Sequence, residues 1–252
     1  GTGVDRRTRF AGILRPDVSR TIFSKKESLS MEFAPEGPQA IPMWINGHAF
    51  LTVTEGFFTV TNPATGEAIR RVPLCGASEA AEAAKAAQGA QPGWAMMGMP
   101  ARRVCLGALA DALDGYAGHF AKLLAQECGF DEARAKAEVS AAVAALHGAN
   151  VGQTGVIGVV LDASRPLAGF AEVIAPALMA GATVVVKPSP KAPSAVFALC
   201  ELSSRANWPA GVLNLLQGDA AAIEGLCAAG IDRLVYGGHA ALGAQIGVMA
   251  EA

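Results

Sequence analysis

Three short segments of this chain place lysine, hydroxyl or glycine residues directly after apolar runs of strand length. Lys187 and Ser189 follow one run, Gly218 follows a second, and Gly238 and His239 follow a third. If these runs are parallel strands, their carboxyl ends meet at the edge where open α/β sheets bind ligands. Lysine supplies donors and charge at such an edge, and glycine lets a ligand approach the backbone. The pattern therefore predicts a ligand crevice.

Each of these residues also has a structural interpretation, which the sequence leaves open. Lys187 could be a solvated loop lysine, and Gly218 could belong to an ordinary strand-to-helix turn. His239 could cap or pack against a helix start, although the glycine pair before it keeps anion binding possible.

Cysteine and histidine give little sign of covalent or metal chemistry. The five cysteines are dispersed without a CxxC pair, and four of them fall on apolar helical patterns. Such thiols are typically reduced, buried and structural, which favours a cytoplasmic protein. His48, His119 and His147 have no Cys, Asp or Glu at the spacing of metal ligands, so we predict no metal site. The cysteines are Cys75, Cys105, Cys128, Cys200 and Cys227.

Composition limits the classes of protein and partner. The chain has 252 residues, of which 52% are hydrophobic and 17% charged, with a mean hydropathy of +0.33. This is enough for a substantial core. A net charge of -2 argues against nucleic-acid binding. The apolar run 173–186 is shorter than the roughly 18 residues of a membrane span, and the first residues lack a secretory signal pattern. We therefore expect no membrane association.

Four apolar runs, each followed by a helical pattern, must position the crevice. This alternation predicts an α/β fold with a Rossmann-like open parallel sheet and crossover helices. The predicted strands lie within 155–161, 183–188, 211–218 and 232–238, and the predicted helices within 170–180, 194–206, 220–229 and from Ala240.

A hairpin and a helical segment should precede these units. Asn46-Gly47 is a strong hairpin signal, and alternating residues flank a turn at 62–66. We predict a helix capped by Ser78 and ended by Pro92, a second helix over about 100–127, and a third capped by Asp131.

The N-terminal stretch is basic and shows no sustained period, so we predict a tail or linker over 1–40. A basic arm that docks on an acidic partner is the alternative. The predicted domain covers 41–252, with strands and helices over 41–150 and Rossmann-like βα units over 151–252.

Several segments, in this order and spacing, resemble the nucleotide-binding domain of the aldehyde dehydrogenase superfamily from about Pro42 to Ala252. They are TNPATGEAIRRVPL, GWAMMGMPARRVCLGALADAL, IAPALMAGATVVVKPSPKAPSA, PAGVLNLLQGD and DRLVYGGHAALG.

The resemblance implies a site for NAD or NADP. Lys187 and Ser189 would lie in the loop that holds the adenosine ribose, and Gly218 would lie near the adenine. Gly238 and His239 occupy the place of a Gly-Ser pair that faces the pyrophosphate. The family's ribose-binding Glu is Pro190 here, and its Ser is His239, so we expect weakened cofactor binding.

The resemblance also implies three catalytic parts: a thiolate nucleophile, a Glu general base and an oxyanion-holding Asn. Ser164 aligns with the Asn, and the Cys and Glu of the family belong to segments beyond the matched stretch. We therefore expect no catalytic residue in this chain.

Three functions remain open. The first is a non-catalytic accessory or pseudoenzyme unit whose partner is a catalytic homologue or another protein subunit. The second is an NAD(P)-binding module. The third is a fragment of an active NAD(P)-dependent aldehyde dehydrogenase.

Overall fold

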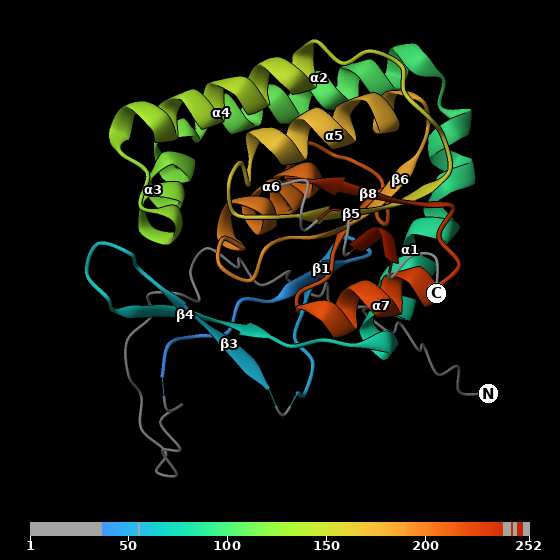
Figure 1. The fold of residues 1–252 in the computed structure, drawn as a ribbon. Helices are drawn as coiled ribbons and strands as arrows, with labels where there is room; N and C mark the ends of the chain where they lie inside the picture. The colour runs from blue at the N-terminus through green and yellow to red at the C-terminus, as the bar shows by residue number, and fades with distance from the viewer. Residues whose placement is uncertain (1–36, 55, 239–242, 244–245, 249–252) are drawn as a thin grey trace, which may run out of the picture. The chain divides into compact units, whose positions relative to one another are not determined.

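A computed structural model of the chain describes residues 37–54, 56–238, 243 and 246–248 (Figure 1). The chain divides into the units Gly1–Pro35 and Glu36–Ala252, and every described residue belongs to the second. The predicted tail over 1–40 thus lies almost wholly outside the described residues. No helix in the described part is long and apolar enough to cross a membrane.

A six-stranded sheet in the order β2-β1-β7-β6-β5-β8 forms the centre of this unit. The last four strands of that order are mutually parallel, as the alternating pattern predicts. The Rossmann-like fold class is therefore confirmed. The bounds are β1 Met43–Ile45, β2 His48–Phe50, β5 Val156–Leu161, β6 Thr183–Lys187, β7 Leu213–Leu215 and β8 Arg233–Gly237.

Strands β1 and β2 form the predicted hairpin, and β1 pairs antiparallel with β7 at the edge of the sheet. Asn46 and Gly47 both have positive φ, 53° and 77°, which a two-residue hairpin turn of this kind requires. The Asn46 backbone N–H donates to Oδ1 of the buried Asn214 at 3.0 Å. A second hairpin, β3 (Phe57–Thr61) and β4 (Ala68–Pro73), forms a separate two-stranded sheet.

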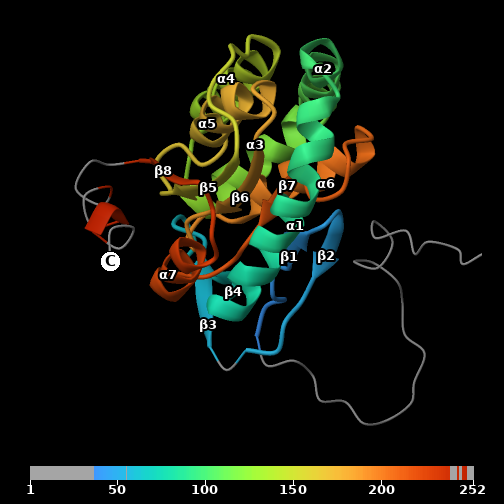
Figure 2. The ribbon, with the colours of Figure 1, turned by 90° about the vertical axis from the view of Figure 1, so that its right-hand side faces the viewer.

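Helices cover both faces of the sheet (Figures 1 and 2). On one face lie α1 (Ala77–Met96) and α7 (Ala220–Ala228), which contact each other. On the other lie α5 (Ala168–Met179) and α6 (Ser194–Arg205). Behind α5 and α6, a further layer is formed by α2 (Met99–Gly115), α3 (Ala117–Cys128) and α4 (Glu132–His147).

Strand β6 shows how the sheet divides the core into two clusters. Val184 and Val186 pack into the cluster with α5 and α6, while Val185 packs into the cluster with α1 and α7. All five residues of β6 are buried, because a parallel strand covered by helices on both faces has no solvated side.

Two predicted helix boundaries in the N-terminal half are wrong. Gly76, not Ser78, is the N-cap of α1, and the Glu79 carboxylate accepts the Gly76 N–H at 3.0 Å. Pro92 lies inside α1 and does not end it. The helix continues because Trp94 is anchored in the core, where its Nε1–H donates to the Leu178 carbonyl at 3.0 Å. Tertiary packing here outweighs the proline penalty.

The single helix predicted over 100–127 is two helices. It breaks at Tyr116, which has φ -107° and ψ 17° between α2 and α3. The preceding Gly115 weakens the helix at that point. By contrast, Asp131 caps α4 as predicted, since its side chain accepts the Arg134 N–H at 2.8 Å.

Two buried carboxylates hold the helix starts of the second face. Glu138 Oε1 accepts the backbone N–H groups of Leu167 and Ala168 at the start of α5. Glu127 accepts the N–H and hydroxyl of Ser194 at the start of α6. These bonds satisfy donors that a helix start leaves free, and they fix the helices that follow β5 and β6.

Candidate functional site

The strand order places the ligand crevice of this sheet between β5 and β8. The chain runs from β5 to β6 to β7 in one direction and then returns to lie on the other side of β5 as β8. The connecting helices follow this reversal, because α5 and α6 cover one face and α7 covers the other. Open α/β sheets bind ligands outside the carboxyl ends of the strands at such a switch point.

Lys187 is the last residue of β6 and is 2% exposed. Its Nζ donates to the carbonyl oxygens of Pro188 at 2.8 Å and Gly218 at 3.0 Å. Burial lowers the pKa of Lys187 to about 8, against an opposing effect of Asp219. Lys187 is thus not a solvated loop lysine. Bonds to the described residues use two of its three N–H donors.

Gly218 lies beside Lys187. Its backbone conformation, however, is explained by packing within the protein. Its φ is +126°, and a Cβ there would lie 3.0 Å from the backbone nitrogen of Cys75 and 3.1 Å from its oxygen. The close approach served by this glycine is to the segment before α1. Ser189 is 8% exposed, and its Oγ accepts the Lys191 N–H at 3.3 Å within the same loop.

Gly238 directly follows β8, so β5 lies between its strand and the strand that ends at Lys187. A Cβ on Gly238 would lie 2.3 Å from both Asp162 Oδ2 and the Tyr236 hydroxyl. Those two atoms are themselves 3.2 Å apart, and the hydroxyl donates to the carboxylate. His239 lies outside the described residues.

Asp162 is a residue of this crevice that sequence reasoning missed. It directly follows β5, and its Oδ1 accepts the backbone N–H of Ser164 at 2.8 Å and the Ser164 hydroxyl at 2.5 Å. Ser164 therefore uses its hydroxyl hydrogen on Asp162. The signal available was its position: Asp162 follows an apolar strand just as Lys187 and Gly238 do.

The described residues fit one end of a dinucleotide and not the other. Lys187 has a donor for a ribose hydroxyl at the ends of β6 and β7. At the ends of β5 and β8, however, the Asp162 carboxylate lies against Gly238, where an anionic pyrophosphate would need donors. Among the described residues, the donor that suits NAD or NADP is therefore that of Lys187.

Burial disfavours the thiolate form of all five cysteines. Cys75 is buried in the turn before α1, and burial raises its pKa to about 12, with a smaller effect of Glu79. Burial raises the pKa of Cys128 to about 12, and also raises the pKa of Cys105, Cys200 and Cys227. A raised pKa opposes formation of the thiolate nucleophile.

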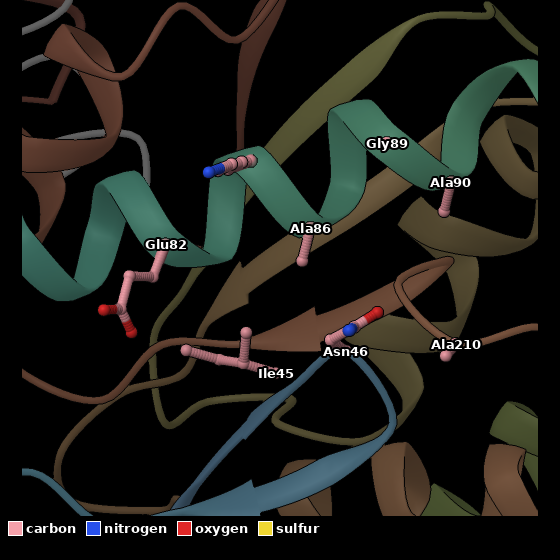
Figure 3. Close-up of a pocket in the computed structure, with 8 residues that line it drawn as sticks. Ile45, Asn46, Glu82, Ala86, Gly89, Ala90 and Ala210 are labelled. Atoms are coloured by element: carbon pink, nitrogen blue, oxygen red, sulfur yellow. The ribbon is translucent and has the colours of Figure 1, made fainter.

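A groove of about 500 Å³ lies at the opposite edge of the sheet, between α1 and the β1–β2 turn. Ala86 and Ala90 point from α1 toward Asn46 and Ala210 (Figure 3). Ala210 precedes β7, so this groove lies at the amino end of that strand and is separate from the crevice beside Lys187.

Comparison with known proteins agrees with this architecture. A family model described as the aldehyde dehydrogenase family matches residues 50–151 and 152–252. The chain is 31% identical over 198 residues to a 3,6-anhydro-alpha-L-galactose dehydrogenase of Streptomyces coelicolor, covering 70% of this chain and 40% of that protein. It is 31% identical over 187 residues to an NADP(+) succinate-semialdehyde dehydrogenase of Escherichia coli, covering 65% and 39%.

Solved structures of the same kind share the fold. A lactaldehyde dehydrogenase from Escherichia coli superimposes with a TM-score of 0.79 at 25% identity, over 85% of this chain and 50% of that one. An indole-3-acetaldehyde dehydrogenase of P. syringae, solved in complex with NAD+, gives 0.77 at 23% identity, over 83% and 48%. The chain thus spans about half the length of the relatives that it matches or less. Because the family model matches both halves of the Glu36–Ala252 unit, the chain belongs to the aldehyde dehydrogenase family.

Proposed function

We propose that this chain is a non-catalytic, aldehyde-dehydrogenase-like unit that serves as an accessory or pseudoenzyme part of a larger dehydrogenase assembly. The observation that carries the proposal is the state of its thiols. Burial raises the pKa of all five cysteines, to about 12 for Cys75 and Cys128. Covalent aldehyde oxidation starts with a thiolate attacking the carbonyl carbon, and these thiols stay protonated at neutral pH.

Two further residues support this proposal. Ser164, which aligns with the family's oxyanion-binding Asn, donates its hydroxyl hydrogen to Asp162. Pro190 offers neither a side-chain acceptor nor an N–H in the loop after β6. The chemistry would then belong to a catalytic homologue or another protein subunit. Five free, dispersed cysteines favour the cytoplasm as the place of this assembly.

The test is whether the purified chain oxidises an aldehyde. Incubation with short-chain and semialdehyde substrates and NAD+ or NADP+ should give no aldehyde-dependent NAD(P)H, and intact-mass spectra should show no trapped thiol adduct. Turnover that disappears when one of the five cysteines is replaced by Ser would instead identify an active dehydrogenase. A complete family member in the same or an adjacent reading frame would supply the partner for reconstitution.

A second candidate function, an NAD(P)-binding module, is favoured by Lys187. Two N–H groups of its buried ammonium donate to the Pro188 and Gly218 carbonyls, which leaves a third donor for a ligand. Lys187 lies at the edge of the sheet where ligands bind. Calorimetric titration should then give saturable NAD+ or NADP+ binding below about 1 mM that is lost in Lys187→Ala. Lys191→Ala is the matched control, because Lys191 is an exposed lysine of the same loop. Equal affinity of both variants would rule out this module.

A further inference from the structure

Helix α1 carries the charged residues Glu79, Glu82 and Lys85, and the last two have no ionic partner in the described part of the chain. Glu79 belongs to the start of the helix, where its carboxylate accepts the Gly76 N–H. Glu82 and Lys85 are exposed and form no ion pair with each other or with another described residue. Residues three apart on a helix are neighbours on its surface, so this pair presents one charge of each sign side by side.

Both side chains border the groove between α1 and the β1–β2 turn. Figure 3 shows Glu82 and Ala86 on the side of α1 that faces Ile45. Beyond the two charges, the wall that α1 gives to the groove is made of the small residues Ala86, Gly89 and Ala90. A groove of about 500 Å³ with such a wall can receive another helix, whose long side chains lay their methylene groups on this surface and keep their charged ends at the rim.

The order of the two charges makes this surface complementary to itself. In a dimer with two-fold symmetry both copies use the same patch, so that residue i contacts residue j while j contacts i. If two α1 helices pack antiparallel around an axis between positions 82 and 85, Glu82 of each copy meets Lys85 of the other. Ser78 then faces Gly89 of the second copy, and both residues are exposed and small enough for closely packed helices.

We propose that the groove beside α1 is a self-association surface, in which α1 of a second copy of this chain packs antiparallel and the two helices exchange Glu82–Lys85 ion pairs. The occupant is a second copy because the patch carries both signs in the order that its own two-fold image requires. A surface for a strongly acidic or basic partner would carry one sign. The groove lies at the amino end of β7, away from the crevice beside Lys187, so the proposal goes beyond the proposed function and does not depend on it.

Sedimentation velocity of the full chain over about a hundredfold range of concentration tests the proposal. The dimeric share of wild type should rise with concentration and fall with added salt, because salt screens ion pairs at the rim of an interface. Lys85→Glu and Glu82→Lys each set like charges opposite one another, and each should weaken dimerisation at least about tenfold. Lys122→Glu replaces an exposed lysine of α3, changes the net charge as Lys85→Glu does, and should match wild type.

Mixing the two weakened variants separates lost pairing from lost folding. Lys85→Glu carries acidic side chains at both positions and Glu82→Lys carries basic ones, so the two should form a mixed dimer within about threefold of the wild-type affinity. Native mass spectrometry identifies the mixed dimer when one variant is isotopically labelled. Two variants that fail to combine on mixing would overturn the proposal.

Gly89→Trp tests the groove itself without changing a charge. A Cβ at Gly89 meets no atom within 4 Å, so the indole starts in open space, and it should fill the groove and abolish dimerisation. Thermal unfolding shows that the variant is folded. Wild type that stays monomeric over the whole range contradicts the proposal and leaves the groove to another partner. A dimer that survives both Gly89→Trp and the single charge reversals forms through another face and contradicts it as well.

Discussion

Lys187 Nζ donates a 3.0 Å hydrogen bond to the Gly218 carbonyl, which joins the loops that follow β6 and β7. The bond brings together two residues separated by 31 positions, and it buries an ammonium group to 2% exposure. A buried cation needs such acceptors, so Lys187 contributes to the loop structure as well as to the crevice.

The buried ammonium predicts a characteristic pH dependence of stability. The pKa of Lys187 is about 8 in the folded chain, below the usual value of about 10.4 in an unfolded chain. Between these values the unfolded chain binds more protons, so the stability of wild type rises with pH. Relative to Lys187→Met, wild type should gain up to about 3 kcal/mol between pH 7 and 10.5. Urea unfolding measures the difference, and parallel pH profiles would contradict it.

The buried Glu127 predicts a large loss of stability on truncation. It accepts both donors of Ser194 and pairs with Arg70 Nε at 3.1 Å. Glu127→Ala leaves these donors without their acceptor and should cost about 2 to 4 kcal/mol. Glu132→Ala is the control, since Glu132 forms an exposed ion pair with Lys136 and its loss should change stability far less. Similar costs for the two variants would show that Glu127 is not a structural anchor.

Glu127 also predicts a pH effect of opposite sign to that of Lys187. Burial raises its pKa, with Ser194 and Arg70 opposing the shift. The folded chain therefore binds this proton more readily than the unfolded chain. The resulting stability is complete below the unfolded pKa and is lost as pH rises through the folded pKa. Wild type should thus become more stable relative to Glu127→Gln as pH falls. Denaturant unfolding of both proteins at a series of acidic pH values measures this difference.

The conformation of Gly218 predicts that even one methyl group disturbs this loop. Gly218→Ala combines a φ of +126° with a contact of 3.0 Å to Cys75 backbone, and should cost about 2 to 3 kcal/mol. Gly66→Ala has a positive φ of 74° but no neighbour within 4 Å, and should cost about 1 kcal/mol. Denaturant unfolding of both variants separates crowding from backbone strain. Equal costs would mean that the Cys75 contact is unimportant.

The raised pKa values of the thiols predict that they react slowly with thiol reagents in the folded chain. At pH 7.5, Cys75, Cys128 and Cys200 should react with a disulfide reagent far more slowly than in denaturant, because burial raises their pKa. Cys105 and Cys227 should react first, because burial of their thiols is less complete. A thiol that reacts faster in the folded chain than in the unfolded chain would be a poised nucleophile and would contradict the proposed function.

Local sequence signals predicted those elements whose physical cause is local. Asn46-Gly47 accepts positive φ at both positions, and Asp131 caps α4 with its own side chain. The two boundaries that were wrong have different causes. At the start of α1 a local bond decides, because the Glu79 carboxylate accepts the Gly76 N–H and replaces the expected cap at Ser78. At Pro92 a distant contact decides, because Trp94 holds the helix through the Leu178 carbonyl.

By itself, the sequence determined the parallel α/β sheet and placed Lys187, Ser189, Gly218 and Gly238 at the ends of its strands. It could do so because the spacing of apolar residues and the residue types of turns are signals that extend over only a few positions. Only the tertiary structure decided which of these ends meet. It joined Lys187 to Gly218, and it set Asp162 and Tyr236 against Gly238. The reason is that β8 returns to pair with β5, a choice made by packing between residues 70 or more positions apart, which no local pattern encodes.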